Sequence, residues 1–439
     1  MTKCAYHPRF LLVSRLAMAT MLVFLSHNLI LDGQTALADP SSPPPQTQAS
    51  PAMPPSAVTF EPMAFSELPG WAADDHLAAW KAFLASCKPV LRAGARPAKP
   101  GSTGEPQALL DICSTALELS KTKSIRTRSE ARQFFEANFR PHRISGGDSE
   151  GLLTGYYEPV IKGSRTPTAI YKIPIYKRPP DLVNMVAESE RGAKSGSFTH
   201  QRRTAKGLEP HLTRSEIEEG GLAGHGLELM YLKDQVDVFF MQVQGSGRIQ
   251  LPNGEKVRVT YDGKNGYPYT SIGKELIADG QMTAEEMSLK SLKSYLRADK
   301  DRAKPVMWKN KSYVFFKELL GNEAKAPMGV MSIPLQTGRS LAVDTTYYAI
   351  GTPIYVDAPR ITHATTSKVF RRLMVAHDVG SAIKGTERGD IYFGSGAEAG
   401  RRAGVTKQPG HLYALLPNET STDYGIPAVP DPKTASMEP

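Results

Sequence analysis

Three aspartates stand beside strand-like apolar runs in the last third of the chain, and carboxyl groups in such places can do acid–base chemistry. Asp344 follows Leu-Ala-Val, Asp378 follows Met-Val-Ala-His, and Asp390 precedes Ile-Tyr-Phe. Aspartate is disfavoured inside strands, so its place at three strand edges needs a reason. A carboxyl group that stays protonated near neutral pH can donate its proton to the leaving oxygen of a glycosidic bond. The alternative is turn capping, because Asp378-Val-Gly380 and Gly389-Asp390 are also typical turn sequences.

The elements that must position these aspartates are predicted to be strands, at about 341–344, 353–357, 372–378 and 389–393. Short strands are also expected from Gly151 onward and over 227–261, with a hairpin turn at Pro252–Glu255 because Asn-Gly tolerates positive φ. Helical spacing of apolar residues predicts helices at His76–Ala93, Pro106–Ser120, Ser129–Phe139, 271–279, 283–297, 312–320 and briefly near Thr213. Asp74 and Ser129 are the expected N-caps of the first and third of these helices. The predicted fold class is mainly β with N-terminal helices, an α+β protein.

Composition places the chain among ordinary globular proteins and sets limits on its partners. Its 439 residues suffice for two or three domains, and 40% are hydrophobic and 22% charged. The net charge of +9 suits an anionic polymer, but no basic run interleaved with aromatics indicates a nucleic-acid partner. The ten histidines are scattered without a metal-binding motif, so neither a metal nor another cofactor is expected.

The N-terminal segment 1–38 has the pattern of an export signal. Positive residues precede a mostly apolar run, Leu16–Leu31, and Ala36-Leu-Ala38 offers a cleavage site for signal peptidase. A Pro-rich tether, whose Pro/Ser/Gln-rich part is 39–58, is expected next. Cys4 precedes the apolar run, so no lipid-attachment cysteine is expected after cleavage, which leaves Cys87 and Cys113. In an oxidising compartment these two can form a disulfide, and two buried free thiols are the alternative.

Several motifs in order resemble one known family. They are LLTGYYEPV (152–160), KIPIYKRP (172–179), FFMQVQGSGRI (239–249), YDGKNGYPYTSIGKEL (261–276), GRSLAVDTTYYAIGTPIYV (338–356) and LMVAHDVGSAIKGTERGDIYFGSGAEAGRRAG (373–404). Together they cover most of the chain from Leu152 to Leu416 and resemble the membrane-bound lytic murein transglycosylase A (MltA-type) family. The last two blocks resemble its three-aspartate (3D) domain.

This resemblance implies a double-psi β-barrel domain that a second β-barrel domain interrupts in sequence, with a glycan cleft between them. The domains expected on this basis are a signal peptide (1–38), a tether (39–70), the N-terminal helical part of the large domain (71–165), the inserted barrel (166–326), the 3D domain (327–417) and a tail (418–439).

The resemblance also assigns roles. Asp390, in Gly-Asp-Ile-Tyr, matches the family's catalytic residue, and Asp378 matches a second aspartate close to it, whose charge or whose cleft would keep Asp390 protonated. Asp344 matches the third aspartate, with a structural or orienting role at the substrate site. Lys384 and Arg388, between the two later aspartates, are expected to be solvated loop cations.

Residues of other matched motifs are candidates for substrate binding. Amide and hydroxyl groups can contact sugar substituents, tyrosine rings can stack on sugar faces, and glycines 245 and 247 allow a sugar to approach closely. The candidates are Gln242, Gln244, Ser246, Gly247, Tyr156 and Tyr157. The alternative for each is a place in a barrel core or a tight turn.

The implied activity is that of a lytic transglycosylase, which cuts the bond between N-acetylmuramic acid and N-acetylglucosamine in peptidoglycan and leaves 1,6-anhydromuramoyl ends. One aspartate would act first as acid and then as base. The alternatives are a non-catalytic glycan-binding double-psi barrel and a hydrolase with Asp378 and Asp390 as a carboxylate pair. The expected protein is a periplasmic monomer that binds glycan strands, with outer-membrane association and wall-synthesis partners left open.

Overall fold

The computed structural model describes residues 58–95, 106–122, 124–145, 151–186, 198–364 and 369–418. The predicted signal peptide, tether residues 39–57 and tail residues 419–439 lie outside this part. The helices are α1 (His76–Gly94), α2 (Gln107–Lys121), α3 (Arg128–Asn138), α4 (Arg214–Glu216), α5 (Gln235–Gln244), α6 (Ile272–Ala278), α7 (Leu289–Ala298), α8 (Lys300–Trp308) and α9 (Gly396–Val405). The strands are β1 (Thr59–Pro62), β2 (Phe139–Ser145), β3 (Leu152–Glu158), β4 (Val160–Ser164), β5 (Ile173–Tyr176), β6 (Leu182–Asn184), β7 (His200–Thr204), β8 (Gly207–Glu209), β9 (Glu228–Leu232), β10 (Ser246–Gln250), β11 (Lys256–Lys264), β12 (Val314–Leu319), β13 (Ser340–Val343), β14 (Pro353–Ala358), β15 (Phe370–Val379), β16 (Arg388–Ser395), β17 (Lys407–Pro409) and β18 (His411–Pro417).

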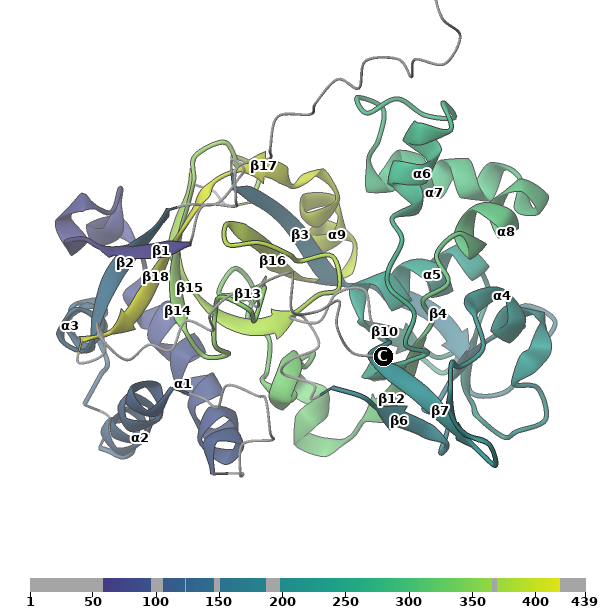
Figure 1. Ribbon diagram of the computed structural model, residues 1–439, viewed down its shortest axis with the longest axis horizontal. Coiled ribbons are helices and arrows are strands. Elements are labelled where there is room, and N and C mark those ends of the chain that lie inside the picture. The colour runs from purple at the N-terminus through teal and green to yellow at the C-terminus, as the bar shows by residue number, and fades with distance from the viewer. Residues whose placement is uncertain are drawn as a thin grey trace, which may run out of the picture. The chain divides into compact units, whose positions relative to one another are not determined.

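The largest sheet joins the two ends of the described chain. Its order is β1–β2–β18–β14–β15–β13–β16–β3–β17, and Figure 1 shows β1 and β18 beside β2. The pairs β13–β15 and β16–β3 are parallel, whereas the other neighbours are antiparallel. The four predicted C-terminal strands are confirmed as β13 to β16, and the α+β class is confirmed as well.

The predicted tether, 39–70, is too long at its C-terminal end. Residues 59–62 form β1, and Met63 and Leu68 are buried in a hydrophobic cluster with α1. Because apolar side chains recur over 58–70, this segment gains more by packing than by remaining an extended linker.

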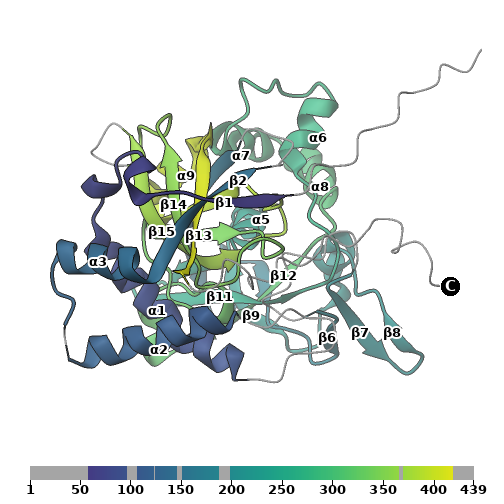
Figure 2. The same ribbon diagram turned by 60° about the vertical axis from the view of Figure 1, so that its left-hand side comes forward.

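The predicted helices α1, α2 and α3 are confirmed and pack together at one end of the large sheet (Figure 2). A disulfide joins Cys87 of α1 to Cys113 of α2, with the two Cα atoms 4.8 Å apart. Both N-cap predictions were wrong, since Asp75 caps α1 and Thr127 caps α3. Asp74 instead accepts two hydrogen bonds from the buried guanidinium of Arg339, at 2.8 and 2.9 Å.

The second sheet has the order β12–β11–β10–β4–β9–β5, and β6, β7 and β8 form a separate small sheet. Glu158 ends β3 in the large sheet and Val160 begins β4 in the second, so the chain crosses over at Pro159. The inserted region therefore begins before the predicted boundary at 165/166. Pro159 explains the break, because proline has no N–H to continue a strand ladder.

A buried ion cluster joins the two sheets at this crossing. Glu158 is fully buried and accepts hydrogen bonds from Arg258 of β11, from Arg248 of β10 at 3.0 Å, and from the Ser395 hydroxyl at the end of β16. One carboxylate on β3 thus connects four strands, β3 and β16 of the large sheet and β10 and β11 of the second sheet.

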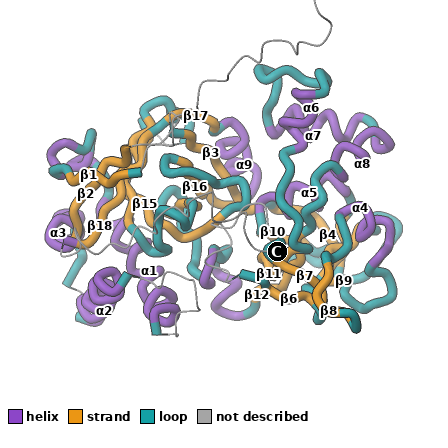
Figure 3. Tube along the Cα trace, in the orientation of Figure 1, coloured by secondary structure: helices purple, strands orange, loops and turns teal. Residues whose placement is uncertain are grey.

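Part of the stretch 227–261, where only short strands and a hairpin turn were predicted, is helix α5. Asp234 caps its start and Gly245, with φ of 74°, ends it. Phe239 and Phe240 face the helical cluster with α6 and α7, while Val238 and Met241 face the sheet. Figure 3 shows α6, α7 and α8 grouped near α5. Both sides of α5 are buried, so its apolar run carries no clear helical period.

The predicted helix at 312–320 was wrong for the same reason. Residues 314–319 form strand β12, and Phe315 and Phe316 are both fully buried, each in a different hydrophobic cluster. A strand that is buried on both faces has no polar alternation, so it is easily taken for a helix.

The hairpin turn at Pro252–Glu255 is confirmed between β10 and β11, with Gly254 at φ of 87°.

Among the described residues, no helix combines the length and the apolar character that crossing a bilayer requires.

Candidate functional site

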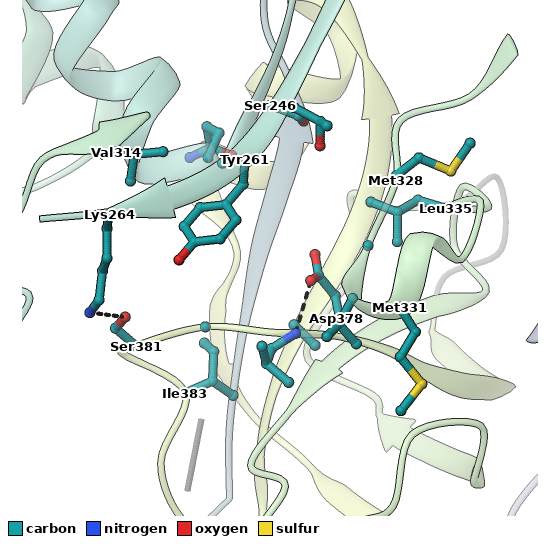
Figure 4. Close-up of a pocket in the computed structure, with 18 of the residues that line it drawn as sticks. Ser246, Tyr261, Lys264, Val314, Met328, Met331, Leu335, Asp378, Ser381 and Ile383 are labelled. Carbon is teal, nitrogen blue, oxygen red and sulfur yellow. Dashed lines mark hydrogen bonds between the residues drawn. The ribbon is translucent and has the colours of Figure 1, made fainter. Parts of the chain in front are cut away.

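A cavity of about 1310 Å³ is lined by residues of both large sheets and of the segments that connect them. From the large sheet it receives Tyr156, Asp378 and Asp390, and from the second sheet it receives Ser246 and Tyr261. Figure 4 shows Tyr261 and Lys264 on one side of the cavity and Asp378 and Leu335 on the other. The cavity is large enough for several sugar units.

Strand register brings Asp378 and Asp390 to the same face of the large sheet. Ala342 of β13 lies opposite Asp378 of β15 on one side and opposite Asp390 of β16 on the other. Two strand spacings separate the Cα atoms of the two aspartates by about 9 to 10 Å. Since the residue between the two aspartates is alanine, no large side chain fills the space between their carboxyl groups.

Side chains on these strands point alternately to the two faces of the sheet, so residues on one face lie toward the cavity and residues on the other lie in the core. Tyr156, Ala342 and Tyr392 lie on the cavity side in one buried cluster. Their neighbours Leu153, Leu341 and Phe393 lie on the opposite side in the main core. The predicted pair of sugar-stacking tyrosines is thereby separated, because successive residues of a strand point to opposite faces.

Asp390 has the environment that an acid catalyst needs. Burial raises the pKa of its carboxyl group above the ordinary value of 3.8, although the charge of Arg388 and a hydrogen bond from Thr154 oppose the shift. The Thr154 hydroxyl donates to Asp390 Oδ1 at 2.6 Å. Burial, one of the two predicted causes of a raised pKa, is thus the largest influence on this carboxyl group and outweighs the two opposing effects.

Asp378 faces the cavity beside Tyr156. Its Oδ1 accepts a hydrogen bond from the backbone N–H of Val379 at 2.9 Å, the dashed line next to Asp378 in Figure 4. Burial, and then the charges of Asp378 and Asp390, raise the pKa of Tyr156. The Tyr156 hydroxyl is therefore neutral at neutral pH and lies near both carboxyl groups.

Asp344 contacts two backbone N–H groups of neighbouring loops. It is buried, and its carboxylate accepts hydrogen bonds from the N–H groups of Thr346 at 3.1 Å and Gly385 at 3.0 Å. It does not line the described cavity. The carboxylate holds the loop 380–387, which joins β15 to β16 and hence connects Asp378 to Asp390.

Gln242, Gln244 and Ser246 all line the cavity. The buried guanidinium of Arg214 donates to Gln242 Oε1, and the N–H of Tyr157 donates to Gln244 Oε1 at 2.9 Å. The two amide oxygens are thus already engaged, and the Gln242 NH₂ group also donates to the carbonyl oxygen of Val314, at 3.5 Å.

Two of the predicted substrate contacts have other roles in the structure. Tyr157 is buried in the main core, against α9, and does not line the described cavity. Gly247 is also absent from the lining, and a Cβ there would collide with Met241 of α5. Gly245 lines the cavity, but its positive φ serves to end α5.

Some residues at the cavity were not among the predicted site residues. Lys264 of β11 donates to the Ser381 hydroxyl at 3.3 Å, a contact that joins the second sheet to the loop 380–387 (Figure 4). Arg388 was expected to be a solvated loop cation, but it lies at the start of β16, lines the cavity and donates to Thr154. Lys384 is not solvated at its tip either, because its Nζ atom is buried, and this burial lowers the pKa of the ammonium group. Thr154 and Lys264 lay in matched motifs, but only the tertiary contacts give them significance.

Within the described part of the chain, no group of three or more histidine, cysteine, aspartate or glutamate side chains is arranged to hold a metal ion.

This chain is similar to known proteins over two matched regions. Residues 152–317 match the family model described as the MltA specific insert domain, and residues 339–416 match the 3D domain. Membrane-bound lytic murein transglycosylase A of Vibrio cholerae is 35% identical over 294 residues, which cover 65% of this chain and 72% of that protein.

Solved structures extend the similarity to most of the described fold. A membrane-bound lytic murein transglycosylase from Agrobacterium tumefaciens is 35% identical, with a TM-score of 0.72, and the match covers 82% of this chain and 98% of that one. Escherichia coli MltA with bound chitohexaose is 26% identical, with a TM-score of 0.56 and coverage of 83% and 95%.

Proposed function

This chain belongs to the MltA family of lytic murein transglycosylases, and on that premise we propose that it cuts peptidoglycan glycan strands without water. The bond cut is the β-1,4 linkage between N-acetylmuramic acid and N-acetylglucosamine, and the product carries a 1,6-anhydromuramoyl end. The observation that carries the proposal is Asp390, a buried carboxyl group with a raised pKa in the wall of the cavity.

In the first step Asp390 acts as the acid. Its proton passes to the glycosidic oxygen, the bond from that oxygen to C1 of N-acetylmuramic acid breaks, and positive charge develops at C1. In the second step the Asp390 carboxylate takes the proton of the C6 hydroxyl of the same sugar, and that oxygen attacks C1. The proton is back on Asp390 at the end. Because the attacking group belongs to the sugar itself, proximity favours ring closure over attack by water.

We assign Asp378 and Tyr156 to the surroundings of the reacting centre. A carboxylate at Asp378 would stabilise positive charge at C1, since its side chain faces the same cavity as Asp390. Tyr156 is the more suitable of the two predicted tyrosines for contact with the sugar, because it lines the cavity. Gln242, Gln244 and Ser246 are proposed to bind sugar substituents, and Asp344 to orient the loop 380–387.

We also propose that the nine-stranded sheet closes as a double-psi β-barrel and the second sheet as a smaller barrel. The parallel pairs β13–β15 and β16–β3 support the first assignment, because β3 precedes the inserted region and β16 follows it.

The proposed ligand is a glycan strand, as the chitohexaose bound to the Escherichia coli relative suggests. Periplasmic location, a monomeric state and wall-synthesis partners remain predictions from the sequence.

Product analysis tests the proposed function. Purified peptidoglycan digested with the full-length protein should release muropeptides with anhydro ends, each lighter by one water than the corresponding reducing end in mass spectrometry. Borohydride should leave these ends unchanged, since they carry no aldehyde. Release of reducing ends alone would mean hydrolysis instead.

Hydrolysis is the second candidate, because one observation favours it. Asp378 and Asp390 flank Ala342 and line the same cavity, and an inverting hydrolase likewise uses two carboxyl groups that face one substrate site. A glycan-binding module without activity would give no products of either kind but would still bind insoluble peptidoglycan.

The pH dependence of cleavage follows from the raised pKa of Asp390. Only the protonated form can start the reaction, so kcat/KM should fall as pH rises through this pKa. The alkaline limb should therefore lie above the ordinary value of 3.8 for an aspartate. Rates of muropeptide release measured from acidic to mildly alkaline pH check this, and a limb at or below the ordinary value would contradict it.

A further inference from the structure

We propose that Thr154 and Arg388 are positioning residues that direct the proton of Asp390 to Oδ2, the oxygen left free to reach the glycosidic bond. This inference rests on the proposed function, because it assumes that Asp390 is the acid. It assigns a task to a threonine and an arginine that lie on two different strands of the large sheet.

The direction of one hydroxyl hydrogen carries the argument. Arg388 Nη2 lies 2.8 Å from Thr154 Oγ1, which lies 2.6 Å from Asp390 Oδ1. A guanidinium can only donate, so Thr154 must accept from Arg388. Its single hydroxyl hydrogen is then available for Asp390, and Oδ1 becomes a fixed acceptor.

A fixed acceptor at Oδ1 determines where the acid proton lies. A proton on Oδ1 would compete with the Thr154 hydrogen for the same short contact, so the neutral carboxyl group carries its proton on Oδ2. With Oδ1 held, the carboxyl plane cannot rotate freely. The donor is thus oriented before substrate arrives, which lowers the cost of reaching the reactive geometry.

Arg388 is itself held in place. Its Nη1 donates to the carbonyl oxygens of Gly389 at 2.6 Å and Leu152 at 3.3 Å. The parallel register of β16 and β3 sets Arg388 opposite Leu152 and Asp390 opposite Thr154. The strand pairing therefore fixes the whole relay, from the guanidinium through the hydroxyl to the carboxyl group.

The same relay suits the second half of the reaction. After proton transfer Asp390 is a carboxylate, and a hydrogen bond from Thr154 with a positive charge behind it stabilises that form. Arg388 and Thr154 both lower the pKa of Asp390 against the effect of burial. The other groups that face Asp390 are Tyr156 of β3, held neutral by its raised pKa, and Asp378 of β15 beyond Ala342.

The test compares Thr154→Val with Thr154→Ser. Valine keeps the shape but cannot donate, so kcat should fall about 10- to 100-fold, the effect of losing a hydrogen bond to a charged group, with KM little changed. The alkaline limb of the pH profile should move to higher pH, because an influence that lowers the pKa of Asp390 has been removed. Serine restores the hydroxyl donor, so Thr154→Ser should have the wild-type kcat and the wild-type position of the alkaline limb.

Thr115→Val is the matched control, since Thr115 lies exposed on α2 and its hydroxyl donates to the Asp111 carbonyl. It should leave rate and pH profile unchanged. A purely structural role of Thr154 would lower thermal stability without moving the limb, and that result would overturn the inference. So would a serine variant as impaired as the valine variant.

Asp390→Asn separates this inference from the proposed function. If Asp390→Asn still cuts glycan strands, the proposed function fails, whatever Thr154 does. If Asp390→Asn is inactive while Thr154→Val keeps the wild-type rate and limb, only the positioning role fails.

Discussion

Asp390→Asn is expected to lower the rate of glycan cleavage by at least about 10³-fold, because one carboxyl group supplies both the acid and the base. Asparagine has the same shape, and its carbonyl oxygen can still accept from Thr154. The cavity should therefore keep its form, and binding to insoluble peptidoglycan should be retained. Muropeptide release and a sedimentation assay measure the two properties on the same preparation.

The same variant should be at least as stable as the wild-type protein at neutral pH. Burial raises the pKa of Asp390, so the folded state loses stability as pH rises from the ordinary pKa to the raised one, and the full loss persists above the raised pKa. Asparagine removes that cost, and thermal unfolding should show an equal or higher Tm.

Asp111→Asn on the exposed face of α2 is the control, with wild-type activity and stability expected. A stable Asp390→Asn protein that cuts at near wild-type rate would end the single-carboxylate mechanism.

Glu158→Ala is expected to destabilise the fold by about 3 to 5 kcal/mol, the usual result of removing one partner from a buried ion pair. Glu158 is fully buried and is the carboxylate partner of Arg258, whose side chain is only 5% exposed, and of Arg248. Without Glu158 the Arg258 guanidinium stays buried without this counter-charge. The free energy of unfolding, measured by chemical denaturation, reports the loss.

Two further variants separate charge from packing at this joint. Glu158→Gln keeps the size and some hydrogen bonds but not the charge, so its loss should be intermediate. Glu398→Ala removes an exposed glutamate that pairs with Arg401 and Arg402 of the same helix, and it should leave the free energy of unfolding close to that of the wild-type protein. Equal losses for Glu158→Ala and Glu398→Ala would mean that the joint contributes no more than a surface ion pair.

Local sequence pattern predicted those elements whose apolar residues lie on one face or are bounded by clear turns. Helices α1, α2 and α3 and strands β13 to β16 belong to this class. It failed for α5 and β12, because both are buried on two sides and their apolar runs have no distinct period. The caps that bound α5, Asp234 and Gly245, were the signal that could have identified it.

The sequence by itself determined the family and the residue types available for chemistry, since ordered motifs and three aspartates can be read along the chain. Only the tertiary structure decided which side chains meet. Thr154 reaches Asp390 across 236 residues of chain, and Tyr156 enters the cavity while Tyr157 enters the core. These outcomes depend on the register of β3 with β16, where a shift of one residue would exchange the two faces. Such pairing, and the burial that raises the pKa of Asp390, arise from contacts between distant segments, which local sequence pattern does not encode.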